Sequence, residues 1–152
     1  MTKDTLQLKS IIDSEQLRGQ LSALTANNDG DGSDNETRKE VLALLKQVSS
    51  RGRDHIESLL MEDGSGSDCA TRLSHLQDEI IRCLYDFAIV HVFRVPNLSA
   101  GERMAIICVG GYGRGELLPH SDIDLLILYR DGCLDSVGPT LEAFLTYLWD
   151  IG

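Results

Sequence analysis

One stretch of twenty residues, VGGYGRGELLPHSDIDLLIL at positions 109–128, constrains the fold of this chain more than any other feature. It joins two short apolar runs, MAIICV at 104–109 and IDLLILY at 123–129. Short, continuous apolar runs bounded by turn residues are typical of buried strands. The residues between them are rich in glycine and leave room for a short helix around 113–117. The stretch therefore predicts a strand, a glycine turn, a short helix and a second strand, which is an α/β arrangement.

Helical periodicity predicts that most of the chain before this stretch is helical. Residues 5–26 show a loose helical pattern, weakened by Gly19, and the polar, glycine-rich residues 27–36 read as a linker. An apolar stripe predicts a helix from Thr37, with a break near Gly52. We therefore expect residues 1–36 to form a flexible extension with an acidic linker.

The longest predicted helix follows a second linker at residues 62–68 and ends at Pro96, because proline cannot continue a helix. Residues 37–96 are thus expected to form a helical region, and residues 97–152 the α/β part. A final helix is predicted at 138–150. Its expected apolar face consists of Leu141, Phe144, Leu145, Leu148 and Trp149.

Charge and composition exclude several classes of protein. The formal net charge is −10, and a strongly acidic chain is repelled by nucleic-acid backbones, so we expect no general nucleic-acid binding. No apolar run reaches the roughly 18 to 20 residues of a membrane span, and the N-terminus lacks the pattern of a signal peptide. The four cysteines form no closely spaced pair, which argues against a zinc site. A cytoplasmic location is the default expectation.

Gly110 and Gly111 follow the first predicted strand directly. Glycine lets the backbone turn sharply and approach a ligand without an intervening Cβ. Successive N–H groups at such a turn, followed by a helix, form an anion site. Taken alone, the glycine pair is explained more simply by a tight turn.

Asp122 and Asp124 flank Ile123 at the start of the second predicted strand. Side chains two positions apart on a strand point to the same face, so both carboxylates are expected to face one spot while Ile123 faces the core. Two like charges at that spacing favour a cation beside them, and Mg²⁺ suits a few carboxylates combined with phosphate oxygens and water. Taken alone, this pair is equally consistent with a solvated strand end.

The spacing of these elements makes the pattern specific, because ten residues separate Gly111 from Asp122. A glycine turn followed at this interval by Asp-x-Asp resembles the signature of the polymerase-β-like nucleotidyltransferase superfamily. Within it, GGYGRGELLPHSDIDLLIL looks like the N-terminal part of the bacterial PII-protein uridylyltransferase/uridylyl-removing enzymes. The segments GRDHIESLL at 52–60 and YLWDIG at 147–152 also look like that family. The resemblance covers roughly residues 38–152.

The resemblance implies a nucleotidyltransferase-like partial mixed sheet preceded by a helical region, and a role for each motif residue. Gly110 and Gly111 would cradle the triphosphate of UTP, with Ser121 adding a hydroxyl and Asp122 and Asp124 binding Mg²⁺. The reaction would be transfer of UMP to a tyrosine of the nitrogen-regulatory PII protein. Arg114 is a candidate phosphate contact, although an ion pair with Glu116 is an equal alternative.

Several parts of the family pattern are absent from the sequence. These are the third carboxylate of the metal site, the HD phosphohydrolase domain and the two ACT domains through which glutamine acts on the full-length enzymes. We therefore expect the chain to be an N-terminal fragment without turnover of its own. A glutamine-synthetase adenylyltransferase, or a non-catalytic nucleotide-binding module, remains an alternative.

Overall fold

The computed structural model describes residues 8–26, 35–92, 104–132 and 134–151. Their elements follow in the order α2 (Ser14–Ala26), α3 (Asn35–Asp63), α4 (Gly66–Phe87), the π-helical turn η1 (Ala88–Val92), β1 (Met104–Cys108), α5 (Gly110–Gly113), β2 (Leu125–Tyr129) and α6 (Leu134–Ile151). None of the helices in these ranges is both long and apolar enough to cross a membrane.

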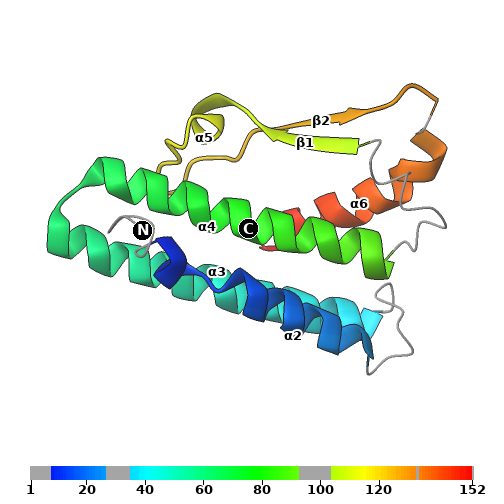
Figure 1. Ribbon diagram of the computed structural model, residues 1–152, viewed down its shortest axis with the longest axis horizontal. Coiled ribbons are helices and arrows are strands. Elements are labelled where there is room, and N and C mark those ends of the chain that lie inside the picture. The colour runs from blue at the N-terminus through cyan, green and yellow to red at the C-terminus, as the bar shows by residue number, and fades with distance from the viewer. Residues whose placement is uncertain (1–7, 27–34, 93–103, 133, 152) are drawn as a thin grey trace.

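Helix α4 is the central element of the structure. Figure 1 shows α2 and α3 on one side of α4 and the sheet with α5 on the other, while α6 begins on the sheet side and passes behind α4. The C-terminal end of α6 reaches α3, where Arg38 pairs with Asp150. The helix has a strong apolar stripe, so it contributes the buried side chains Leu76, Ile80, Leu84 and Phe87 to one core cluster. Aromatic edge-to-face contacts, Tyr85 with Phe144 and Phe87 with Tyr147, tie α6 to it.

Strands β1 and β2 pair antiparallel, with Met104 opposite Tyr129 and Cys108 opposite Leu125. The predicted α/β class with a preceding helical region is therefore confirmed, although the described residues form an antiparallel pair rather than a mixed sheet. Only one face of this sheet packs against the helical core. The other face leaves three large side chains about half-exposed: Ile107 at 40%, Leu126 at 46% and Leu128 at 48%. The prediction of fully buried strands was wrong for this face, because the helices cover only the opposite one.

The loose helix predicted at residues 5–26 is present over residues 14–26. Residues 14–26 form α2, in which Leu17 and Leu21 are almost fully buried against the core. An ion pair of 3.0 Å joins Arg18 to Asp86 of α4. Gly19 had weakened the helical prediction, but tertiary packing of these leucines outweighs its low helix propensity. Residues 1–7 and 27–34, which hold most of the predicted acidic linker, lie outside the described residues.

Helix α3 is continuous, so the predicted break near Gly52 is wrong. Gly52 is buried where α3 crosses α4, and a Cβ built on it would lie 2.6 Å from the Leu76 side chain. The glycine is explained by this close approach of the two helices rather than by a helix end. The predicted end of the following helix at Pro96 lies outside the described residues.

Helix α6 begins at Leu134, four positions before the predicted start at 138. Its buried face runs through Phe144 and Tyr147, while Trp149 is 77% exposed. Placing Trp149 on the apolar face was therefore wrong, because the stripe that passes through Phe144 meets Tyr147 one turn later.

The predicted linker at 62–68 is mostly ordered structure in which a tight turn joins α3 to α4. Asp63 at the end of α3 accepts a hydrogen bond from the Ser65 backbone N–H at 2.9 Å and pairs with the buried Arg72 guanidinium at 2.7 Å. These two contacts, the Ser65 N–H first and Arg72 second, hold the pKa of the Asp63 carboxyl below its usual 3.8. The turn is thereby fixed at the end of α4 nearest to the glycine stretch.

This pKa shift predicts how the stability of the turn depends on pH. A carboxyl whose pKa is lower in the folded state stabilises the fold above its unfolded pKa and loses that contribution as the pH falls below 3.8. We expect Asp63→Asn to lower the melting temperature at pH 7. This difference from wild type should shrink as the pH falls below 3.8. Thermal unfolding followed by circular dichroism checks this result. Glu62→Gln, an exposed neighbour on the same helix, is the control; an equal effect of that variant would contradict the assignment.

Candidate active site

The glycine stretch forms a tight bend directly after β1. The Val109 N–H donates to the Asp124 carbonyl at 3.0 Å and so continues the strand pairing for one more residue. Gly110 then adopts a positive φ of 63°, a conformation that glycine takes at little cost. The single helical turn α5 follows, closed by the Gly113 N–H donating to the Val109 carbonyl at 2.9 Å. The bend is therefore hydrogen-bonded to the chain segment that carries the two aspartates.

Gly110 lies directly against one of the two predicted metal ligands. A Cβ built on Gly110 would stand 2.6 Å from Asp124 Oδ2, closer than such contacts allow. Glycine is thus required here twice, by the backbone conformation and by the approach of the carboxylate. The bend and the acidic pair, which ten residues separate in the sequence, are therefore neighbours in space.

A polar cavity of about 860 Å³ opens beside this bend. Five of the six predicted site residues line it, namely Gly111, Arg114, Ser121, Asp122 and Asp124. Gly110 does not line the cavity, but it lies against Asp124, which does. A volume of this size is typical of small-ligand sites. The structure therefore brings the predicted residues together, while their roles as ligands stay predictions.

Both carboxylates reach the cavity from the segment that leads into β2. The strand begins at Leu125, two residues later than predicted, so Asp122 and Asp124 precede the regular strand. Their arrangement nevertheless alternates as expected: both aspartates are exposed and line the cavity, whereas Ile123 packs against the helical core. The cavity thus has two acidic side chains on one wall.

Arg114 and Ser121 already have partners within the loop. The Arg114 guanidinium donates to Glu116 Oε2 at 3.0 Å and to the Gly110 carbonyl at 2.9 Å. The ion pair that was an alternative to phosphate contact is therefore present, but it is an exposed pair of the kind that contributes little to stability. The Ser121 hydroxyl donates to the Leu118 carbonyl at 2.9 Å, which leaves its lone pairs as acceptors.

Another part of the cavity lining comes from the start of α4, which begins inside the segment predicted as a linker at 62–68. Gly66, Ser67, Ala70 and Thr71, from the first turns of α4, form this part of the lining. Ser65 caps the helix by accepting the Asp68 N–H at 3.3 Å. The Ser-x-x-Asp pattern of residues 65–68 is a helix-start signal that would have placed the helix correctly.

The donor set at the cavity fits Mg²⁺. Two neighbouring carboxylates, joined by phosphate oxygens and water, are the coordination that Mg²⁺ prefers in nucleotide enzymes. Within the described ranges, no group of three histidine, cysteine or acidic side chains could hold a metal ion. Any ion at Asp122 and Asp124 would therefore need further ligands from the nucleotide, the solvent or another segment.

A family model confirms the class of protein that this bend and acidic pair define. Residues 97–145, which contain both motifs, match the model of the nucleotidyltransferase domain. No solved structure is a significant match to the chain.

Three curated relatives of the chain share one enzyme name, which is more specific than the description of this domain. The chain is 42% identical over 146 residues, 96% of its length, to the bifunctional uridylyltransferase/uridylyl-removing enzymes of two strains of Caulobacter vibrioides. It is 41% identical over 145 residues to the enzyme of the same name from Phenylobacterium zucineum. The resemblance to this family of enzymes is thereby confirmed, and its extent was underestimated, because it covers the N-terminal helices as well. The chain spans 15% of the length of these relatives.

Proposed function

We propose that this chain provides the nucleotide- and metal-binding part of a uridylyltransferase that transfers UMP from UTP to a tyrosine of the PII protein. The observation that carries the proposal is the cavity in which Asp122 and Asp124 face Gly111 and Ser121. Its support from the comparisons is the identity of about two residues in five with enzymes named uridylyltransferases.

Different residues of the cavity would hold the cation and the phosphates of the substrate. Asp122 and Asp124 would hold Mg²⁺, which supplies charge neutralisation at the phosphates and a lowered pKa for the attacking hydroxyl. The glycine bend lets the triphosphate approach the backbone closely. The Arg114 guanidinium lines the cavity and would turn from Glu116 to a phosphate oxygen, an acceptor with which it can form a charge-assisted hydrogen bond of the same kind.

The reaction at this site is an in-line displacement at the α-phosphorus of UTP. The tyrosine oxygen forms the new bond to phosphorus, and the bond from phosphorus to the bridging oxygen of the pyrophosphate breaks. The tyrosine proton passes to solvent, and pyrophosphate is the leaving group. In this scheme the two carboxylates would hold the cation, and we expect the described residues alone to bind nucleotide without transferring it.

The proposal is tested by calorimetric titration of the chain with UTP and with ATP, each with Mg²⁺ and with EDTA. We expect UTP to bind in the presence of Mg²⁺ and its affinity to fall at least about tenfold without the metal. A preference for ATP would favour a glutamine-synthetase adenylyltransferase instead. An absence of any metal-dependent binding would overturn the nucleotide site itself.

A further inference from the structure

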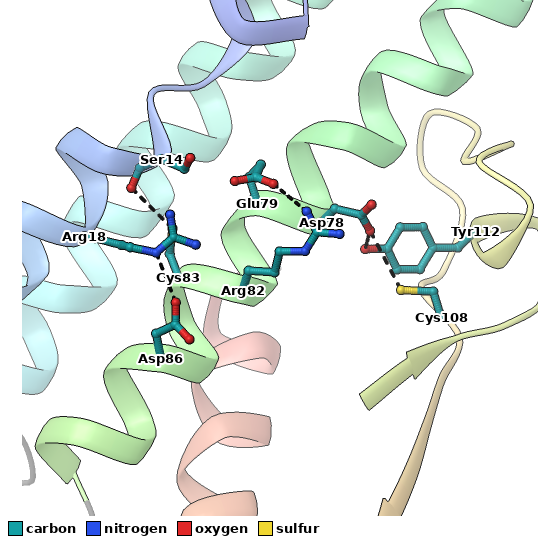
Figure 2. A network of polar contacts seen from close by, with 9 residues as sticks. All are labelled: Ser14, Arg18, Asp78, Glu79, Arg82, Cys83, Asp86, Cys108 and Tyr112. Carbon is teal, nitrogen blue, oxygen red and sulfur yellow. Dashed lines mark hydrogen bonds and ion pairs between the residues drawn. The ribbon is translucent and has the colours of Figure 1, made fainter. Parts of the chain in front are cut away.

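The carboxylate of Asp78 contacts both flanks of the glycine bend. Asp78 lies in the middle of α4, and its Oδ1 accepts the Tyr112 hydroxyl at 2.6 Å and the Cys108 thiol at 3.8 Å (Figure 2). Cys108 is the last residue of β1 and Tyr112 directly follows Gly111. A single acceptor on α4 is therefore hydrogen-bonded to Cys108 and to Tyr112, the residues on either side of Val109, Gly110 and Gly111.

The contact with Tyr112 is well suited to hold the bend. The Tyr112 side chain is only 4% exposed, and the short distance to a carboxylate indicates a strong hydrogen bond. Burial, and next the hydrogen bond to Asp78, raise the pKa of the Tyr112 hydroxyl far above its usual value. The hydroxyl therefore remains a donor over the whole working range of pH.

The far end of the loop is held by the same face of α4. Ser74, one turn before Asp78, accepts the backbone N–H of Leu117 at 3.1 Å while its own hydroxyl donates to the Ala70 carbonyl at 2.9 Å. Both Ser74 and Leu117 are buried. The loop from Cys108 to Leu117 is thus fixed to α4 at two places one helical turn apart.

The position of the bend matters because Gly110 lies directly against Asp124. A Cβ added at Gly110 would stand 2.6 Å from Asp124 Oδ2, so a small shift of the bend would change the distance between the backbone and the acidic pair. Precise placement of groups that bind a transferring phosphate accounts for a large part of catalysis in such enzymes. The anchor on α4 sets that placement from outside the cavity.

We propose that Asp78 is a positioning residue for the nucleotide site, which through Tyr112 and Cys108 holds the glycine bend at its working distance from Asp122 and Asp124. This inference rests on the proposed function, since the bend is taken to receive the triphosphate. Asp78 does not line the cavity, so it acts through the bend and not on the nucleotide.

The test compares Tyr112→Phe, Asp78→Ala, their double variant and Asp78→Asn by titration with UTP and Mg²⁺. Tyr112→Phe keeps the buried ring and removes only the hydroxyl. We expect each of the first two to weaken UTP binding about tenfold, the effect of losing one hydrogen bond to a charged acceptor. The double variant should lose no more than Asp78→Ala alone, because that variant already removes the hydrogen bond from Tyr112. Asp78→Asn should retain most of the affinity, since its amide oxygen still accepts the hydroxyl proton.

Asp86→Ala is the matched control, because Asp86 lies on the same helix and pairs with Arg18 of α2, away from the bend. Its affinity for UTP should equal that of the wild type. Equal binding by wild type, Tyr112→Phe and Asp78→Ala would overturn the inference while leaving the proposed function intact.

A second measurement decides the inference if the wild type itself binds no UTP, a result that would contradict the proposed function. Amide hydrogen exchange of the ligand-free chain should then be about tenfold faster at residues 110–113 in Tyr112→Phe and Asp78→Ala than in wild type and Asp86→Ala. Unchanged exchange at the bend would show that Asp78 does not hold it.

Discussion

Replacing Asp124 with asparagine is expected to abolish Mg²⁺-dependent UTP binding by this chain and to reduce UMP transfer by an enzyme that contains it about a thousandfold or more. Asparagine keeps the size and shape of the side chain but removes the negative charge that a divalent cation requires. Asp124 is also the carboxylate beside the glycine bend, so it would hold a cation next to the backbone that is proposed to receive the triphosphate. The same substitution at Asp122 should have a comparable effect.

The fold itself should tolerate the Asp124→Asn change. The side chain is exposed, and two like charges on one cavity wall repel each other when no cation is bound. The melting temperature should therefore be unchanged or slightly raised. Asp131→Asn, an exposed aspartate at the opposite end of β2, is the control and should bind UTP normally. Retained metal-dependent binding in Asp124→Asn would refute the metal assignment.

The clustering of the candidate site residues was predictable from the sequence, because the features that bring them together lie in one short stretch. A positive φ and a close backbone approach both demand glycine, and alternation about Ile123 separates the carboxylates from the core, so a stretch of twenty residues carries most of the information. The helical region was predictable in type because apolar residues recur at helical spacing, as in α4.

The errors arose where contacts between distant segments decide the structure. Gly52 suggested a break only because its partner Leu76 was unknown. The segment at 62–68 suggested a linker because the ion pair between Asp63 and Arg72 is invisible to composition. The hydrogen bond between Asp78 and Tyr112 spans 34 positions, and no periodicity or motif announces it. Such pairings can be identified only from the three-dimensional structure. One of them, Asp78 with Tyr112, lies beside the candidate site.

Two glycines of this stretch, Gly113 and Gly111, provide a final test, because different atoms surround them. At Gly113 an added Cβ would lie 2.5 Å from the Cys108 carbonyl oxygen and 2.9 Å from its carbon. Both atoms are backbone at the end of β1, so they cannot move aside as a flexible side chain would. We expect Gly113→Ala to destabilise the protein by about 2 to 3 kcal/mol and to weaken UTP binding as well. Chemical denaturation together with UTP titration measures both effects.

Gly111→Ala should behave differently. The nearest atom to its added Cβ is the Glu116 carbonyl oxygen at 3.5 Å, an ordinary contact, so the free energy of unfolding should change by less than about 1 kcal/mol. The methyl group would nevertheless occupy the cavity wall where the triphosphate is proposed to meet the backbone, so UTP affinity should fall. A variant that is stable and binds UTP as tightly as wild type would show that Gly111 serves only the turn, and the phosphate-binding role of the bend would have to be abandoned.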